Sequence, residues 1–253
     1  MSGLYYVLMK WAPVDLKSGS SYGRYMICFP SRYDADEIYR EMEKVPNLVG
    51  DLSRLSPQFW VYTGESLVNQ IVAGYFSEHK NLCSIYLLPN ADDIGGPPII
   101  PNPVTGPDWL SDNTFFIRNR RQPNLYWFVH DTHIHTSEQR RTKFRIKQEI
   151  STGKSRQSVL IRKDKVTVAA VAETVGSAAV LGNGTKYVSI RKLKGKSNCL
   201  VLANTPHPWV FQDFIDGQVG VRWGTEIEEE KDQGAKPLVV FMPDGGGDEW
   251  ELC

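Results

Sequence analysis

One proline-rich segment divides this chain into two parts with different sequence patterns. Residues 90–108 read NADDIGGPPIIPNPVTGPD and contain five prolines. Proline lacks a backbone N–H and fixes φ, so neither a helix nor a central strand tolerates this density. We therefore predict a linker at residues 94–108, between an N-terminal domain of residues 1–93 and a C-terminal domain of residues 109–253.

The N-terminal part alternates strand-like and helix-like segments. Residues 31–45 place apolar side chains at helical spacing, and Ser31 can cap that helix. A second helix is predicted at residues 65–80, and the predicted strands are residues 3–14, 23–30, 58–64 and 83–89. This order of elements predicts a small α/β domain with right-handed crossover connections.

The C-terminal part is a succession of short β-prone segments. Helical periodicity nearly disappears after Trp109, and twelve apolar segments follow, among them residues 158–163 and 209–215. This density of short strands is typical of a closed barrel or sandwich. A faint threefold rhythm is also present, because FFIRN, SVLIRK and CLVLAN open successive thirds of this part. The predicted fold class is α+β multidomain, with an α/β domain followed by an all-β domain.

Three of the five histidines lie in HDTHIHTSEQRR, residues 130–141. If HIHT is a strand, His133 and His135 face one side and Ile134 faces the other. The preceding residues 125–129 are aromatic and β-prone, so the HDT between them suits a hairpin connection. We expect a hairpin whose two strand histidines point outward and are available for a ligand. No metal site is predicted, because the chain has neither a CxxC nor an HExxH motif.

Charge and hydropathy narrow the classes of partner. The chain has 29 Lys and Arg and 29 Asp and Glu, so its overall field does not favour nucleic acid or an acidic membrane. No 18 apolar residues run together, no signal peptide is recognised, and the four cysteines lack paired spacing. We expect a cytoplasmic protein without a cofactor, and a homodimer could form through the N-terminal domain.

No catalytic signature is complete. The GES at residues 64–66 lacks the second glycine of a nucleophile elbow, since Val68 stands there. The STGKS that begins at Ser151 lacks the first glycine of a phosphate loop, since Gln148 takes that place. Cys199 lies in an apolar segment and suits a core thiol better than a nucleophile. We predict that the protein is not an enzyme, and a hydrolase with an unrecognised site stays open as an alternative.

The C-terminal half resembles a β-trefoil, the family format of which is twelve strands in three four-stranded repeats. Ricin-type lectin trefoils close their repeats with Q-x-W, whereas the corresponding phrases here are KFRI, KYVS and EWEL, with only Trp250 in place. A closer likeness is to the fungal mycocypins, trefoil inhibitors of cysteine proteases, because SDNTFFIR resembles the start of those chains and VVFMPDGGGDEWEL resembles their end. The resemblance covers residues 109–253 and does not extend to the first 93 residues.

The mycocypin resemblance implies an inhibitor of papain-like proteases. In that family, loops between early strands enter the active-site cleft, which here implies the segments 118–124 and 137–142. A solvated turn with basic residues would have the same sequence, so the inhibitor is a hypothesis. Its candidate protease-binding residues are Arg118, Arg120, Arg121, Pro123, Asn124 and Glu138.

A carbohydrate-binding lectin is the alternative form of recognition. Sugar sites need an aromatic ring beside oriented polar groups, and strand alternation should bury one of Tyr126 and Trp127. The candidate carbohydrate-binding residues are Trp127, His133, His135 and Trp209. We therefore predict non-enzymatic recognition of a protein or a glycan, with protease inhibition ranked first and sugar binding close behind.

Overall fold

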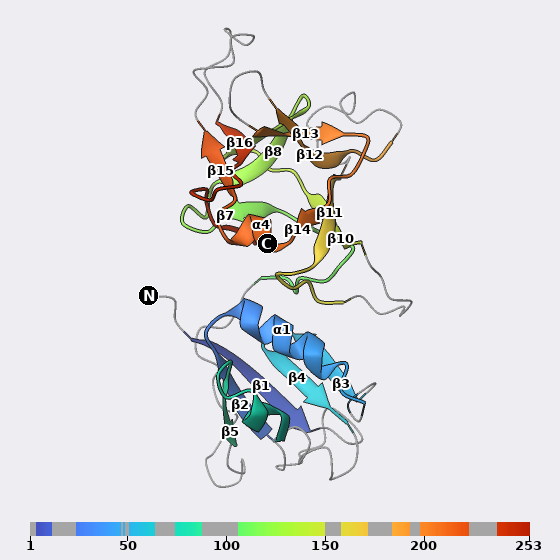
Figure 1. The fold of residues 1–253 in the computed structure, drawn as a ribbon, viewed down its shortest axis with the longest axis vertical. Helices are drawn as coiled ribbons and strands as arrows, with labels where there is room; N and C mark the ends of the chain where they lie inside the picture. Colours follow the sequence, from blue (N-terminus) through green and yellow to red (C-terminus); the bar gives the residue numbers. More distant parts are fainter. Residues whose placement is uncertain are drawn as a thin grey trace. The chain divides into compact units, whose positions relative to one another are not determined.

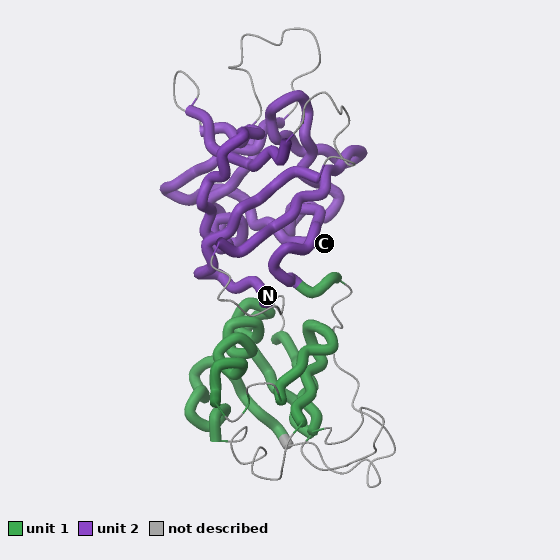
Figure 2. Tube along the Cα trace, turned by 90° about the vertical axis from the view of Figure 1, so that its right-hand side faces the viewer, with its two compact units in different colours: residues 1–108 green, residues 109–253 purple. Residues whose placement is uncertain are grey.

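The computed structural model describes residues 4–11, 24–46, 48, 51–63, 74–87, 106–149, 158–171, 184–192, 198–222 and 237–253. The chain divides into two compact units, residues 1–108 and residues 109–253 (Figure 2). The division falls where the sequence predicts the C-terminal domain to begin. We call the two parts the first unit and the second unit.

The first unit contains a five-stranded sheet in the order β3, β4, β1, β2, β5. Only β1 and β4 are parallel, and the other neighbouring strands are antiparallel. The elements are β1 Tyr5–Trp11, β2 Arg24–Phe29, α1 Arg32–Met42, β3 Leu52–Ser56, β4 Phe59–Tyr62 and β5 Ser84–Leu87. The sheet is therefore mixed and mainly antiparallel, whereas the sequence predicts an α/β layer with crossover connections.

Helix α1 lies against one face of this sheet (Figure 1). The predicted cap at Ser31 is confirmed, because its side-chain oxygen accepts a hydrogen bond from the backbone N–H of Asp34 at 3.3 Å. Burial alternates along β1, and the Tyr39 ring of the helix packs 5.1 Å from the ring of Trp60 on β4. Of the second predicted helix, residues 65–80, only 74–80 are described, and 74–78 are helical.

The second unit contains a twelve-stranded sheet. Its main path runs β17, β7, β8, β9, β16, β13, β12, β11, β10, β6, with β14 paired to β11 and β15 to β16. The path ends at β6. Phe116 alone separates β6 from β7, the second strand of the path, so the two ends of the path lie together. The strands are β6 Asn113–Phe115, β7 Ile117–Asn119, β8 Tyr126–His130, β9 His133–Ser137, β10 Phe144–Gln148, β11 Lys165–Ala170, β12 Tyr187–Lys192, β13 Asn198–Ala203, β14 Trp209–Val210, β15 Val219–Arg222, β16 Leu238–Phe241 and β17 Trp250–Leu252.

The prediction that the second half is mainly β-structure is confirmed, with two local differences. Within the described part of the predicted strand 158–163, the pairing is a single bridge between Val159 and Leu110. The end of the predicted strand 209–215 is instead the helix α4, Gln212–Ile215. Phe211, which precedes this helix, and Phe214 and Ile215 within it are all buried. Their spacing suits a helical turn better than a strand.

Aromatic side chains fill the centre of the second unit. The ring of Trp127 meets the rings of Phe144, Phe214 and Trp250 at centroid distances of 5.9, 5.8 and 5.5 Å. The buried indole of Trp250 donates a hydrogen bond to the carbonyl of Val219 at 2.7 Å. These contacts join strands from both ends of the unit, so the loops between strands begin from a well-packed core.

None of the helices in the described ranges has the length and apolar character needed to cross a bilayer.

Candidate binding surface

Two loops of the second unit start at the same end of three neighbouring strands. Residues 120–125 join β7 to β8, and residues 138–143 follow β9. Tyr126 lies opposite Arg118 on β7 and also opposite Ser137 on β9, so both loops leave adjacent strand ends. The structure thus brings together the two segments that the mycocypin resemblance implies.

A buried asparagine shapes the first loop. Asn119 is 2% exposed, and its Oδ1 accepts hydrogen bonds from the backbone N–H groups of Arg121 and Gln122, both at 2.9 Å. Its own N–H donates to the carbonyl of Leu125 at 2.8 Å, which closes the loop. Asparagine commonly stabilises turns in this way. The loop therefore has a fixed backbone before any partner arrives.

The three arginines of this loop region differ in how strongly they are held. Arg118 Nε donates to Glu251 Oε1 at 2.6 Å, and the two residues lie directly opposite each other on β7 and β17. Arg120 donates to Glu249 at 3.3 Å, whereas Arg121 is 3.7 Å from the same carboxylate. The Arg121 side chain is 79% exposed, so of the three it is the most accessible to a partner.

The second loop is also fastened by a side chain at its start. Ser137 Oγ accepts hydrogen bonds from the backbone N–H groups of Gln139 and Arg140 at 3.2 and 3.1 Å. At its end, Thr142 is buried, and its N–H donates to the carbonyl of Trp127 at 3.0 Å. Both ends of the loop are therefore tied to the sheet.

The tips of both loops face solvent. Pro123 and Asn124 on the first loop and Glu138 on the second are exposed. All six predicted protease-binding residues thus lie at one end of the β7, β8 and β9 strands. The arrangement is an arginine-rich surface with two solvent-exposed loops, in which Glu249 and Glu251 partly balance the positive charge.

The aromatic platform predicted for sugar binding is not formed. Trp127 and Trp209 are both completely buried, and the Trp209 indole donates to the carbonyl of Val188 at 2.9 Å. A ring in the core cannot stack on a sugar, so this part of the lectin prediction is corrected. Of Tyr126 and Trp127, one of which strand alternation was expected to bury, Trp127 is the buried residue and Tyr126 is partly exposed.

The histidine segment forms the predicted hairpin, but not with the predicted exposure. His130 pairs with His133 across the turn, which confirms the hairpin. His133 is partly exposed, and the Arg191 guanidinium donates to its Nε2. His135 is only 5% exposed, because β9 is flanked by β8 on one side and by β13 and β16 on the other, and Leu238 lies opposite it. The prediction that both strand histidines point outward is therefore wrong for His135.

Neither metal binding nor thiol chemistry gains support from the described residues. Among them, no group of three or more histidine, cysteine, aspartate or glutamate side chains is placed to hold a metal ion. Cys199 is completely buried, and this burial raises the pKa of its thiol. A thiol with a raised pKa is a poor nucleophile at neutral pH, which agrees with its prediction as a core residue.

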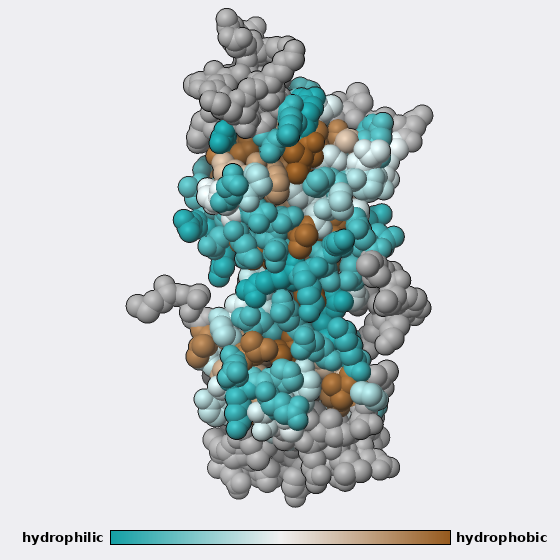
Figure 3. Space-filling model, viewed as in Figure 1, coloured by the Kyte–Doolittle hydropathy of each residue, from teal (hydrophilic) through white to brown (hydrophobic). Residues whose placement is uncertain are grey.

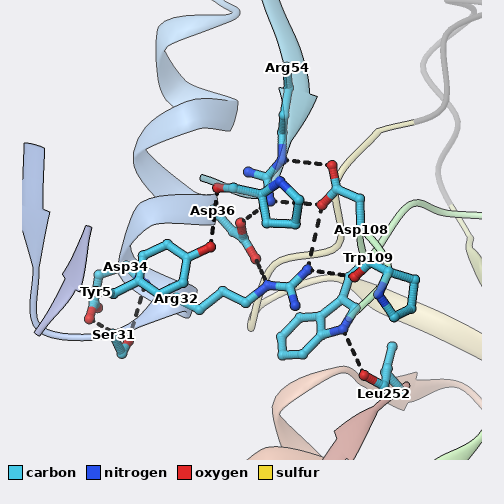
Figure 4. Close-up of polar contacts among 11 residues, drawn as sticks. Tyr5, Ser31, Arg32, Asp34, Asp36, Arg54, Asp108, Trp109 and Leu252 are labelled. Carbon is cyan, nitrogen blue, oxygen red and sulfur yellow. Dashed lines mark hydrogen bonds and ion pairs between the residues drawn. The ribbon is translucent and has the colours of Figure 1, made fainter. Parts of the chain in front are cut away.

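The first unit contains a buried ion cluster that no sequence motif predicts (Figure 4). Arg54 on β3 contacts Asp36 of α1 at 2.7 Å, and it donates two hydrogen bonds to the carboxylate of Asp108, both at 2.8 Å. Arg32 lies 3.6 Å from Asp36 and 3.5 Å from Asp108. We call these four residues the ion cluster. It fastens the last residue of the predicted linker to the first unit.

The ion cluster is a structural feature because its charges neutralise one another. The side chains of Arg54 and Asp36 are 3% and 1% exposed, and the rings of Tyr39 and Trp60 lie 5.3 and 6.0 Å from the Arg54 guanidinium. Burial raises the pKa of Asp36, and the guanidinium groups of Arg54 and Arg32 oppose this rise. The only local signal for the cluster is the spacing of four residues between Arg32 and Asp36 on one helix face.

The first unit also has a shallow apolar groove on the face of its sheet away from α1. It has a volume of about 560 Å³ and is lined by residues that include Tyr6, Met26 and Cys28. Leu4 and Tyr86 at its border are 54% and 58% exposed. The predicted homodimer through this unit stays a prediction.

Comparison with known proteins adds no second line of evidence. No protein-family model matches the chain, and no curated protein matches its sequence. The binding surface is therefore interpreted from its own geometry.

Proposed function

We propose that the second unit is a β-trefoil that inhibits a papain-like cysteine protease, without catalysing a reaction itself. The protease contacts are assigned to the two loops at residues 120–124 and 138–141. The observation that carries this proposal is that two separate, side-chain-fastened loops leave adjacent strand ends.

The pairing of strands supports the trefoil part of the proposal. The segments beginning at Trp109, Val159 and Trp209 recur at equal spacing along the chain and open three groups of strands, so the third group is taken to begin at β14 and not at CLVLAN, which forms β13. Each group contains an antiparallel pair of consecutive strands, namely β8 with β9, β11 with β12, and β15 with β16. The last strand, β17, pairs with β7 of the first group. This is the pattern expected of three similar units closed on one another.

The fixed backbone conformation of the two loops supports the proposal that this surface inhibits a protease. A loop that enters an enzyme cleft must lose little conformational entropy on binding, and a preformed backbone reduces that cost. Asn119 and Ser137 each accept two backbone hydrogen bonds within their loops, so both loops are formed in advance. Pro123 restricts the first loop further, because its φ is fixed. Arg121 and Glu138 are then available to contact a protease.

The test is inhibition of papain by the full chain, titrated from nanomolar to micromolar concentration. We expect stoichiometric inhibition, and we expect Arg121→Glu to raise the inhibition constant by about tenfold or more, since one contact of 1.4 kcal/mol corresponds to a factor of about ten. Lys192→Glu is the matched control, because this exposed residue lies at the end of β12 and undergoes the same charge change.

Two results would overturn the proposal. The first is a folded chain, verified by circular dichroism, that does not inhibit papain at micromolar concentration. The second is equal inhibition by the Arg121 and Lys192 variants, which would mean that the inhibitory surface is elsewhere. Retention of inhibition by Lys192→Glu together with its loss in Arg121→Glu supports the assigned loops.

A further inference from the structure

A line of positive side chains follows strand β10 and the residues that lead into it. Arg141, Lys143, Arg145 and Lys147 occupy alternate positions, and we call them the cationic stripe. The side chains between them are at most 1% exposed, namely Thr142, Phe144 and Ile146. Because alternate residues of an extended chain point to the same side, the four cations lie on one face at intervals of about 6.6 Å.

Aromatic rings position the first half of the stripe. The Arg141 guanidinium lies 4.5 Å from the centre of the Phe116 ring, and the Lys143 ammonium lies 5.3 Å from the same ring. Arg141 also lies 5.6 Å from the ring of Tyr126. Both charges therefore make cation–π contacts with the Phe116 ring, and Arg141 also contacts Tyr126.

The strand itself is held on both sides. β10 pairs with β11 along one edge and with β6 along the other, so its backbone is fixed within the sheet. The partners of Arg145 in these pairs are Thr114 and Ala169, and the partner of Lys147 is Thr167. These neighbours are short, so the two exposed cations extend beyond them into solvent. In the view of Figure 3 the second unit is largely hydrophilic.

Most of the stripe is not neutralised within the described chain. Arg141, Arg145 and Lys147 form no ion pair with any carboxylate among the described residues. The acidic residues near its far end include Asp112, next to the partner of Ile146, Glu149, which follows β10, and the buried Asp164, which accepts a hydrogen bond from Gln148 at 2.8 Å. Like charges at neighbouring positions repel one another and disfavour the compact state. An anion with repeated charges would relieve this repulsion.

We propose that the cationic stripe binds a linear acidic polysaccharide, whose sulfate or carboxylate groups lie along β10. The stripe extends for about 20 Å, which suits a flexible polyanion with many charges better than a single small anion. A single-stranded nucleic acid fits less well, because such sites combine a basic groove with exposed rings on which bases stack. Here the ring of Phe116 is occupied by Arg141, and Trp127 is buried. The proposal does not depend on protease inhibition.

The test is binding of the full chain to a fluorescently labelled heparin dodecasaccharide, measured by anisotropy at an ionic strength of about 0.15 M, where screening leaves only close charges effective. We expect micromolar or tighter binding by the unmodified protein. The double variant Arg145→Gln with Lys147→Gln is expected to bind at least about tenfold more weakly. Shared between two residues, this loss is smaller for each residue than one typical charge-assisted hydrogen bond. Both side chains are exposed, so the fold is expected to be retained.

The matched control is Lys80→Gln with Lys192→Gln, which removes two exposed charges from other places. Retained affinity in this control supports the assignment to β10. The proposal is overturned if the unmodified protein does not bind at micromolar concentration, or if the control loses as much affinity as the stripe variant. It is also overturned if an oligothymidylate or poly-L-glutamate of equal charge binds as tightly, because the surface would then not select polysaccharides.

Discussion

Arginine has opposite surroundings in the two units. In the first unit, the side chain of Arg54 is 3% exposed and contacts two carboxylates and two aromatic rings. In the second unit, the side chain of Arg121 is 79% exposed and has one carboxylate at 3.7 Å. The first arginine is surrounded by groups that neutralise it, whereas the second is available to another molecule.

This difference separates charges that maintain a fold from charges that can recognise a partner. A buried cation must be paired, because an uncompensated charge inside a protein is strongly destabilising. An exposed cation contributes little to stability, and its removal should leave the fold intact. Variants of the first kind should therefore lower stability, and variants of the second kind should alter binding.

The largest effect is expected from Arg54→Ala. It leaves the buried carboxylate of Asp36 without its nearest cation, and removal of one partner from a buried pair typically costs about 3–5 kcal/mol. Amide hydrogen exchange by mass spectrometry should show faster exchange in β1 and β4, while peptides from β8 and β9 should be unchanged. Lys44→Ala, on an exposed residue just after α1, is the control.

A second variant distinguishes loss of charge balance from loss of packing. Arg54→Met combined with Asp36→Leu removes both charges, and it leaves Arg32 with Asp108 at 3.5 Å. Replacing a buried pair by apolar residues is often close to neutral, so most of the stability should return. If the double variant is as unstable as Arg54→Ala, the ion cluster acts through its geometry and the comparison between the units must be revised.

The ion cluster also shows where prediction from the sequence ends. The Ser31 cap, helix α1 and the hairpin of β8 and β9 are local features, and their predictions are confirmed. The sequence does not indicate strand β3, because LSRLS carries polar side chains and, among the described strands, pairs with β4 at the edge of the sheet. Arg54 on this strand donates a hydrogen bond to Asp108, which lies 54 positions later in the chain, and no local sequence pattern indicates such a contact.

Burial of aromatic and histidine side chains was equally hard to predict. The alternation rule assumes that one face of a strand is exposed, yet three successive residues are buried in both β8 and β9. His135 and Trp127 are therefore inside, together with Trp209. By contrast, polar side chains next to proline indicate an exposed turn, and Arg120, Arg121, Pro123 and Asn124 are exposed.

An intermediate effect is expected from Asn119→Ala. Two backbone N–H groups of the first loop lose their acceptor, and loss of a buried hydrogen-bond partner costs about 1–3 kcal/mol. Hydrogen exchange should increase at Arg121 and Gln122, and the unfolding free energy of the second unit should fall. Asn124→Ala is the matched control, since Asn124 is an exposed asparagine of the same loop. Equal destabilisation by both variants would contradict the role assigned to Asn119.

The smallest effect is expected for the pair formed by Arg118 and Glu251. These residues lie opposite each other at 2.6 Å, but their side chains are 35% and 27% exposed, so water and salt screen the attraction. A double-mutant cycle with Arg118→Ala and Glu251→Ala should give a coupling free energy below about 1 kcal/mol in denaturant unfolding. The coupling should decrease further in high salt. A coupling as large as that of the ion cluster would mean that these loop arginines maintain the fold, and it would weaken the case that this surface is free to bind a partner.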